Sequence, residues 1–260
     1  MRGIEQSGVL ISGGCGDIGL AVASRFLEAG ARVILADRLS AAKGKAVIAK
    51  RLKSAHVSFV TCDVTRAASV DAAFSAAMKI LGRLDTVICN AGVALNEPFL
   101  TATEKAWGST LAVNLTGGFL TAQRAAQIMR KNRRKAHGRR GTILFTGSWV
   151  QDMPFPNGVS YCSSKAGQQM MAKVIAQELA PHGINVSLVA PGMVYAGLTK
   201  KIYDENKKFA KLVHKIVPLG RMSTTQEVAG SFLFLASDDG AYITGTSLLV
   251  DGGATLVRRD

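Results

Sequence analysis

The sequence predicts an α/β fold in which a doubly wound parallel sheet carries helices on both faces. Short β-branched runs alternate with longer amphipathic stretches along the whole chain. The expected strands are continuous apolar runs, which is typical of strands buried on both faces of a parallel sheet. The 260 residues contain no internal repeat and no linker, and α/β folds often run to about 250 residues as one domain. We therefore expect a single domain over residues 1–260.

Each element follows from its own local pattern. Runs of β-branched and other apolar residues predict strands at 9–12, 33–37, 57–61, 86–90, 142–146, 185–190 and 247–251. Apolar residues at helical spacing predict helices at 18–29, 41–52, 69–81, 161–180 and 225–236, and either one long helix or two joined helices over 105–130. Residues 131–140 are expected to form a loop, and residues 193–222 an irregular insertion. Because this insertion follows the carboxyl end of a strand, where open α/β sheets bind ligands, we expect it to bind the substrate.

The net charge is +14, and two segments carry much of it. Eight basic residues lie between Arg124 and Arg140 without an acid, and six lysines lie between Lys200 and Lys215. Such an excess can attract nucleic acid or an anionic substrate. Neither segment contains a nucleic-acid-binding motif or interleaved aromatic residues, so we expect a solvated basic surface and no specific nucleic-acid partner.

The sequence also points to a cellular compartment. No stretch reaches the roughly 18 consecutive apolar residues that a membrane span requires, and the N-terminus lacks the apolar run of a signal peptide. The four cysteines lie far apart, without a C-x-x-C pair or a histidine cluster, so we expect no metal site. Scattered free thiols fit the reducing cytosol, so we expect a cytoplasmic protein without a membrane partner.

A glycine-rich turn, Ser12–Gly19, joins the first strand to the first helix. Glycines in such a turn let the backbone approach a pyrophosphate, and the helix N-terminus offers free N–H groups and a positive dipole. Asp37 ends the second strand 18 residues after Gly19, near the position where an acid binds a ribose 2′-hydroxyl. Its carboxylate would repel a 2′-phosphate, which favours NAD, while the adjacent Arg38 leaves NADP open.

Tyr161 and Lys165 are four residues apart on an expected helix and so share one face of it. An ammonium that close to a phenol stabilises the phenolate and lowers the tyrosine pKa from about 10. Such a tyrosine can take a proton from an alcohol or give one to a carbonyl. The pair is therefore a candidate acid–base centre.

Further motifs follow one another along the chain: Asp63-Val64, Cys89-Asn90-Ala91-Gly92, Asn114, Ser148 thirteen residues before Tyr161, Pro191-Gly192 and the ending YITGTSLLVDGG. Together with the glycine-rich turn and the Tyr161–Lys165 pair, they make the chain from Val9 to Gly253 resemble a classical short-chain dehydrogenase/reductase. The resemblance implies a single-domain, NAD(P)-binding Rossmann fold. It also implies a homotetrameric oxidoreductase that interconverts a secondary alcohol and a ketone by hydride transfer.

The resemblance assigns roles to individual residues. Tyr161 would be the general acid/base, Lys165 would lower its pKa and bind the nicotinamide ribose, and Ser148 would hydrogen-bond the substrate oxygen. Asn114 would hold a water that links Lys165 to solvent. The cofactor-binding residues would be Gly13, Cys15, Gly16, Asp17, Ile18, Gly19, Asp37, Arg38, Asp63, Val64, Asn90, Ala91, Gly92, Tyr161, Lys165, Pro191, Gly192 and Val194.

The chain departs from the family pattern at two positions. Asp17 stands where the turn usually has its middle glycine. Gly16 is expected to supply the flexibility one position earlier, and Asp17 to cap the helix N-terminus. Ala196 stands where a threonine often contacts the carboxamide, so backbone groups from Gly192 to Val194 are expected to suffice, with Thr199 a weaker substitute.

Two substrate classes stay open. Gln151, Asp152 and Asn157 lie in the loop after Ser148, and their polarity suits a sugar or polyol. The alternative is a 3-oxoacyl thioester, because the basic stretches suit an acidic acyl-carrier-protein partner. A non-catalytic nucleotide-binding regulator is a further alternative, which the Asp17 departure favours and the intact catalytic residues oppose.

Overall fold

Seven parallel strands form one sheet in the order β3-β2-β1-β4-β5-β6-β7. The computed structural model describes residues 1–256, apart from the side chains of Ala136 and Leu198. The strands are β1 Gly8–Ser12, β2 Arg32–Asp37, β3 Val57–Thr61, β4 Thr86–Cys89, β5 Gly141–Thr146, β6 Ile184–Pro191 and β7 Ser247–Val250. Each overlaps a predicted strand, and the predicted parallel α/β sheet is confirmed.

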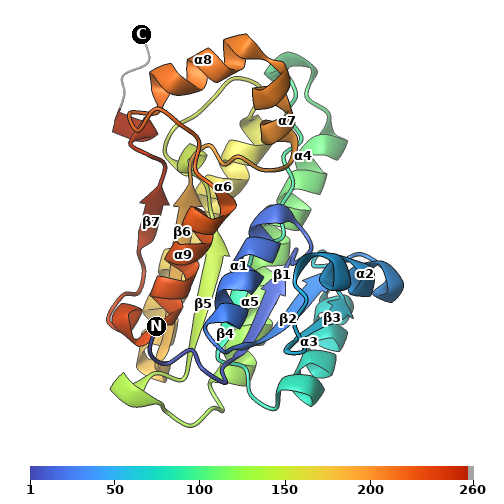
Figure 1. Cartoon of the computed structure of the whole chain (residues 1–260), viewed down its shortest axis with the longest axis vertical. Coiled ribbons are helices and arrows are strands. Elements are labelled where there is room, and N and C mark those ends of the chain that lie inside the picture. Colours follow the sequence, from blue (N-terminus) through green and yellow to red (C-terminus); the bar gives the residue numbers. More distant parts are fainter. Residues whose placement is uncertain (257–260) are drawn as a thin grey trace.

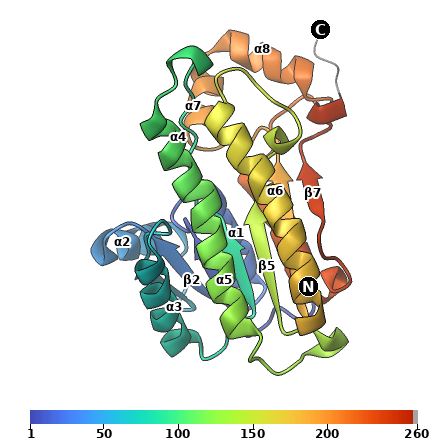
Figure 2. The ribbon, with the colours of Figure 1, turned by 180° about the vertical axis from the view of Figure 1, so that it is seen from behind.

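Helices cover both faces of the sheet (Figures 1 and 2). They are α1 Asp17–Glu28, α2 Ala41–Arg51, α3 Ala67–Leu81, α4 Glu104–Leu111, α5 Gly117–Met129, α6 Val159–Leu179, α7 Gly197–Glu205, α8 Lys207–Ile216 and α9 Thr225–Ala236. α1 and α9 pack together on the face seen in Figure 1, and α3, α5 and α6 pack on the opposite face, seen in Figure 2. Phe26 and Phe232 belong to the apolar cluster of the first face, and Phe74 and Phe145 to that of the second. Because both faces are buried, the strands are apolar along their whole length.

Residues 105–130 form two joined helices, which is one of the two predicted arrangements. A π-helical turn, Ala112–Thr116, joins α4 to α5. π-Helical turns are rare and occur frequently at functional sites. Asn114 lies inside this turn and is fully buried, so the turn brings a polar residue into the interior.

The prediction that residues 193–222 form an irregular insertion is wrong, because this segment contains two helices, α7 and α8. Phe209, Val213 and Ile216 recur at helical spacing in α8 and pack against a small apolar cluster. The intervening lysines are exposed, so α8 is an amphipathic helix whose apolar residues stand at i, i+4 and i+7, a spacing that the sequence already contained. Both helices lie at the end of the molecule toward which the strands point (Figure 1).

The direction of strand addition reverses between β1 and β4. β2 and β3 extend the sheet on one side of β1, and β4 to β7 extend it on the other. A crevice at such a switch point, outside the carboxyl ends of the strands, is where open α/β sheets bind ligands. Within residues 1–256 no helix combines the length and the apolar character of a bilayer-spanning segment.

Candidate active site

The glycine-rich turn lies at the carboxyl end of β1, beside the switch point. Gly13 has φ +60°, and a Cβ there would lie 2.7 Å from the Cα of Ala91, so only glycine fits. The N-cap of α1 is Gly16, and any residue can adopt its φ of −75°. The backbone conformation that requires glycine is therefore found at Gly13, and the prediction that Gly16 supplies it is wrong. No side chain caps the N-terminus of α1, which leaves its N–H groups available to an anion.

Asp17 does not cap α1, contrary to the prediction, because it is the first residue of that helix. Its Oδ2 instead accepts a hydrogen bond of 2.9 Å from the backbone N of Gly197, at the start of α7. Its Oδ1 lies 3.6 Å from Nη2 of Arg51. Asp17 therefore joins the glycine-rich turn to the insertion that was expected to bind the substrate.

Asp37 ends β2 beside the same turn, and its Oδ2 accepts a hydrogen bond of 3.1 Å from the backbone N of Cys15. Burial and the Asp37 carboxylate raise the pKa of the Cys15 thiol to about 11, so this thiol stays protonated at neutral pH. Arg38 is exposed, and its charge reaches Asp63 at the end of the neighbouring strand. Asp63 accepts hydrogen bonds from Thr65, which lower the pKa of its carboxyl.

Asn90 connects three segments at the switch point. Its Nδ2 donates to the backbone O of Gly13 over 3.0 Å, and its Oδ1 accepts from Oγ1 of Thr146 over 3.0 Å. Ser12 Oγ accepts from the backbone N of Asn90 and of Ala91. Gly92, which follows Ala91, lies close to the candidate residue Lys165, because a Cβ there would lie 3.9 Å from Nζ of Lys165.

Ser148, Tyr161 and Lys165 come together at the carboxyl end of β5. Ser148 follows β5 by two residues, and Tyr161 and Lys165 lie one turn apart in α6. Lys165 is 4% exposed, and its Nζ donates a hydrogen bond of 2.6 Å to the backbone O of Thr146. Nζ also lies 5.7 Å from the centre of the Tyr161 ring. Burial lowers the pKa of Lys165 to about 8.

The pKa of Tyr161 is raised rather than lowered, contrary to the prediction from its spacing to Lys165. Burial deprives the phenolate of water and raises the pKa, and a hydrogen bond with Ser148 opposes this only in part. The Lys165 ammonium lies 5.7 Å from the centre of the Tyr161 ring, and burial disfavours its own charge. At neutral pH the phenol is therefore protonated and able to donate.

Both the oxygen and the nitrogen of the Asn114 side-chain amide form hydrogen bonds within the protein. Its Oδ1 accepts from the backbone N of Val93, and its Nδ2 donates to the backbone O of Val93 and to Oγ of Ser164. Its backbone O accepts a hydrogen bond of 3.2 Å from Nε2 of Gln168. Gln168 was not among the predicted site residues, although its position three residues after Lys165 places it on the same helical face.

Backbone contacts hold the segment that joins β6 to α7 in place. The backbone N of Gly192 donates to the backbone O of Val250, and Val194 pairs with Ser223 in an isolated bridge. Ala196 is the N-cap of α7 and offers no side-chain hydroxyl at the position of the family's threonine. Thr199 lies in α7, one turn further along.

The wall beside Tyr161 is apolar. Trp149, Val150, Val213, Val217 and Met222 are buried there, and Met193, Phe155, Tyr203, Phe209 and Ile216 pack against them. Two of the three polar loop residues that suggest a sugar have other side-chain partners. Gln151 Nε2 donates to Oγ of Ser247, and Asp152 accepts from Gln169, whereas Asn157 lines a cavity together with Phe155 and Cys162.

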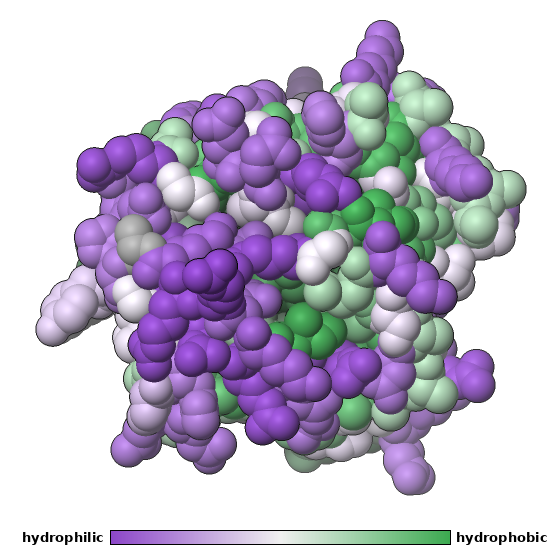
Figure 3. Space-filling view, turned by 90° about the horizontal axis from the view of Figure 1, so that it is seen from below, coloured by the Kyte–Doolittle hydropathy of each residue, from purple (hydrophilic) through white to green (hydrophobic). Residues whose placement is uncertain are grey.

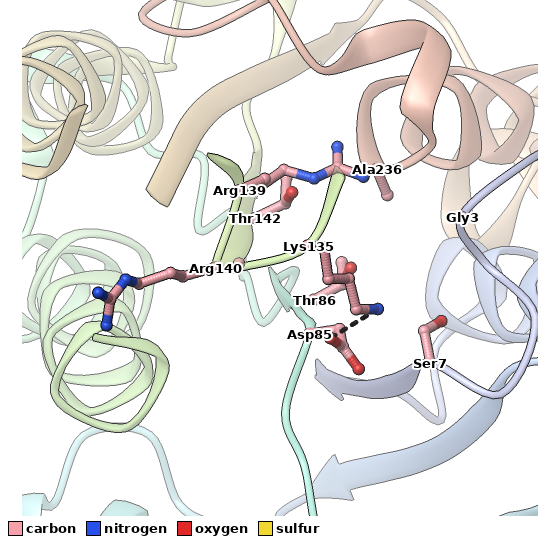
Figure 4. Close-up of a pocket in the computed structure, with 10 residues that line it drawn as sticks. Gly3, Ser7, Asp85, Thr86, Lys135, Arg139, Arg140, Thr142 and Ala236 are labelled. Carbon is pink, nitrogen blue, oxygen red and sulfur yellow. Dashed lines mark ion pairs between the residues drawn. The ribbon is translucent and has the colours of Figure 1, made fainter. Parts of the chain in front are cut away.

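The basic run 124–140 lies at the opposite end of the sheet from this site. Lys135 Nζ and Arg83 Nε lie 2.8 and 2.6 Å from Oδ1 of the buried Asp85. Burial opposes ionisation of Asp85, but these hydrogen bonds outweigh it and lower the pKa of the carboxyl. Figure 4 shows Lys135 pointing to Asp85 across a small hollow, and Figure 3 shows hydrophilic residues over much of this end. Lys135 of the basic run therefore stabilises the fold by pairing with a buried carboxylate.

These features fit a nicotinamide dinucleotide. Free N–H groups at α1 and the glycine-rich turn suit a diphosphate, the Asp37 carboxylate suits a ribose, and Nζ of Lys165 lies near Gly92 at the same carboxyl edge of the sheet. Among the described residues, no group of three or more histidine, cysteine or acidic side chains is arranged to hold a metal ion.

The comparisons with known proteins agree with this geometry. Residues 15–255 match the family profile described as enoyl-(acyl carrier protein) reductase. The chain is 36% identical to the D-threitol dehydrogenase of Mycolicibacterium smegmatis, over 95% of this chain and 92% of that protein. It is 35% identical to the 3-oxoacyl-[acyl-carrier-protein] reductase MabA of Mycobacterium tuberculosis, over 94% of this chain and 91% of that protein.

A solved structure extends the likeness to the fold. The 3-ketoacyl-(acyl-carrier-protein) reductase of Brucella melitensis, complexed with NADH, superposes with a TM-score of 0.86 at 27% identity, covering 97% of this chain and 99% of that one. The family profile and the relatives span nearly the whole chain, and the relatives named above act on an alcohol or a ketone. The chain therefore belongs to the short-chain dehydrogenases/reductases, oxidoreductases that act on CH–OH donors with a nicotinamide cofactor.

Proposed function

We propose that this chain interconverts a secondary alcohol and a ketone, with Tyr161 as the general acid/base. The observation that carries the proposal is the convergence of Ser148, Tyr161 and Lys165 beside Gly92, at the carboxyl end of the sheet. A bound nicotinamide supplies the hydride donor or acceptor; the protein supplies position and electrostatics. The catalytic residues would be Asn114, Ser148, Tyr161 and Lys165.

The side chains divide the proton chemistry among them. Ser148 Oγ orients the substrate oxygen and already hydrogen-bonds Tyr161. The Tyr161 hydroxyl gives its proton to the ketone oxygen in reduction and takes it back from the alcohol in oxidation. The Lys165 ammonium stabilises the phenolate left by reduction, since an opposite charge nearby favours the ionised form. The raised pKa of Tyr161 keeps the proton-donating form available at neutral pH.

NAD is the proposed cofactor, with NADP as the alternative. The Asp37 carboxylate is held by the backbone N of Cys15 at the edge of the glycine-rich turn, where it would meet a 2′-hydroxyl and repel a 2′-phosphate. Arg38 is exposed beside it and is the one neighbour in sequence that would attract a 2′-phosphate.

Two substrate classes are supported by different observations. The likeness to a D-threitol dehydrogenase favours a polyol. The apolar wall of Trp149, Phe209 and Val213 and the exposed lysines of α7 and α8 favour the second candidate, a 3-oxoacyl thioester. Such a substrate has an apolar chain and a phosphate-bearing carrier, which suit an apolar wall with a basic rim.

A substrate panel tests the proposal. Purified protein would be assayed with D-threitol and other polyols in the presence of NAD or NADP, and with acetoacetyl thioesters in the presence of NADH or NADPH, following nicotinamide absorbance. We expect turnover with one class and a preference for the cofactor without the 2′-phosphate. Cofactor binding without turnover of any alcohol or ketone would contradict catalysis and favour the nucleotide-binding regulator.

Asp17 is expected to weaken binding of the cofactor diphosphate. Its carboxylate lies in the first turn of α1, where it competes electrostatically with an anion at the helix N-terminus. Asp17→Asn should tighten NADH binding by roughly two- to fivefold, because a charge near a helix end contributes about 0.3–1 kcal/mol. Fluorescence titration of NADH at low salt checks this, with Asp204→Asn as an exposed control. Equal or weaker binding by Asp17→Asn would contradict the expectation.

A homotetramer in the cytoplasm remains part of the proposal. Exposed apolar residues on neighbouring helices, Phe119 of α5 and Met170 and Val174 of α6, support an interface between copies of the chain. Tyr242, before β7, and Leu249, in β7, are also exposed and would supply a second interface. All four cysteines are unpaired, which fits a reducing compartment.

A further inference from the structure

Gln168 bridges two of the proposed catalytic residues. Its Oε1 accepts a hydrogen bond of 3.2 Å from Nζ of Lys165, and its Nε2 donates one of 3.2 Å to the backbone O of Asn114. All three residues are almost completely buried, with exposures of 1% for Gln168, 4% for Lys165 and 0% for Asn114. The bridge therefore lies within the protein and links α6 to the π-helical turn.

The hydrogen-bond partners of the Gln168 amide determine its orientation. Gly118 of α5 faces it, and a Cβ at that position would lie 3.3 Å from Nε2 of Gln168. An ammonium only donates and a carbonyl only accepts, so the amide must turn its oxygen to Lys165 and its nitrogen to Asn114. Glutamine satisfies both partners at once, which neither an apolar nor an ionised side chain can do.

The bridge determines where the Lys165 ammonium points. An ammonium has three N–H donors, and the backbone O of Thr146 and Oε1 of Gln168 occupy two of them. Among the described residues, no carboxylate pairs with Lys165, so neutral oxygens alone orient its charge. The third N–H is left for a ligand in the crevice, on the side of Gly92.

We propose that Gln168 is a positioning residue that aims the free N–H of Lys165 at the nicotinamide ribose. The inference rests on the proposed function and deepens it, because it identifies Gln168 as the side chain that connects Lys165 to Asn114. The Gln168 amide makes both hydrogen bonds of that link.

Binding of NADH compared with ADP tests the proposal. ADP shares the adenosine diphosphate of NADH but lacks the nicotinamide ribose, so it reports on the rest of the site. Gln168→Met removes both hydrogen bonds at similar size and should weaken NADH about tenfold, the low end for hydrogen bonds to charged groups, while the ADP Kd stays within about twofold. Gln168→Glu keeps an acceptor for Lys165 and should retain NADH affinity within about threefold of wild type.

The neighbouring glutamine provides the matched control. Gln169 lies on the same helix and hydrogen-bonds Asp152 at the surface, so Gln169→Met should leave both affinities unchanged. If Gln168→Met does not fold, Gln168→Asn replaces it, because its amide is one methylene shorter and cannot reach both partners. The same loss of NADH affinity is expected.

The outcomes separate the possibilities. Unchanged NADH affinity in Gln168→Met, or equal weakening of NADH and ADP, would overturn the positioning role. Loss of NADH affinity in Gln168→Glu as large as in Gln168→Met would also overturn it. If the wild-type protein binds neither NADH nor NADPH, the proposed function itself fails and the inference falls with it, a result already visible before any variant is made.

Discussion

Replacing Tyr161 with phenylalanine should lower turnover by about 10²- to 10⁴-fold, the usual contribution of a positioned general acid or base. The ring would still fill its place beside Trp149 and Val150, because only the hydroxyl is lost. Steady-state kinetics on the substrate found in the panel would measure the loss. NADH binding should persist with a much smaller loss than that of turnover, because Tyr161 is one of many expected cofactor contacts and those at the glycine-rich turn and Asp37 do not involve its hydroxyl.

Tyr242 gives the matched control for the same substitution. It is fully exposed and far in the sequence from the catalytic residues, so Tyr242→Phe should leave turnover unchanged. Turnover of Tyr161→Phe within tenfold of wild type would mean that another group carries the proton. Loss of NADH binding in step with turnover would instead indicate a damaged site.

Replacing Lys165 with methionine should abolish turnover and remove a pH dependence from the stability of the fold. Burial lowers the pKa of Lys165 from 10.5 to about 8. At about 1.36 kcal/mol per unit, burying the charge costs roughly 3 kcal/mol below pH 8. The variant also loses the two hydrogen bonds from the Nζ ammonium to Thr146 and Gln168, each contributing about 1.5–3 kcal/mol because the donor is charged. At pH 7 the lost hydrogen bonds therefore at least offset the burial cost that is relieved, and the variant should be no more stable than wild type.

The difference in stability between wild type and this variant should grow with pH. Between about pH 8 and pH 10.5 the unfolded chain holds a proton on Lys165 that the folded chain has released, so wild-type stability rises with pH in this window. The cost of the buried charge then disappears, and only the lost hydrogen bonds remain. Lys165→Met should therefore be less stable than wild type near pH 10.

Urea unfolding at pH 7 and near pH 10 measures both arms. Lys173 is exposed on the same helix, so Lys173→Met controls for the general effect of removing one charge from α6. A stability difference between wild type and Lys165→Met that is the same at pH 7 and near pH 10 would show that the ammonium is better solvated than its burial indicates.

The main correction concerns the acid–base pair. A spacing of four residues places Tyr161 and Lys165 on one helical face, and the structure agrees. The spacing says nothing about water, however, and burial raises the pKa of the phenol and lowers that of the amine. Desolvation depends on residues from β5, the π-helical turn and α8 that are remote in sequence. Local patterns therefore predicted the pair but not its titration.

The sequence by itself determined most of the strands and helices and the segments that carry the proposed catalytic and cofactor residues. These depend on periodicity and on motifs a few residues long, in which each residue's neighbours in sequence are also its neighbours in space. The glycine-rich turn, Asp37, Ser148, Tyr161 and Lys165 are of this kind.

Only the tertiary structure decided what these residues touch. Asp17 meets Gly197, 180 positions later in the chain, and Gln168 meets Asn114, 54 positions earlier. The polar loop that suggested a sugar turns to partners on α6 and β7, while the lysine-rich insertion folds into helices over an apolar wall. Hydrogen bonds and desolvation act over a few ångströms between segments that the fold brings together, and no local pattern in the sequence records those distances.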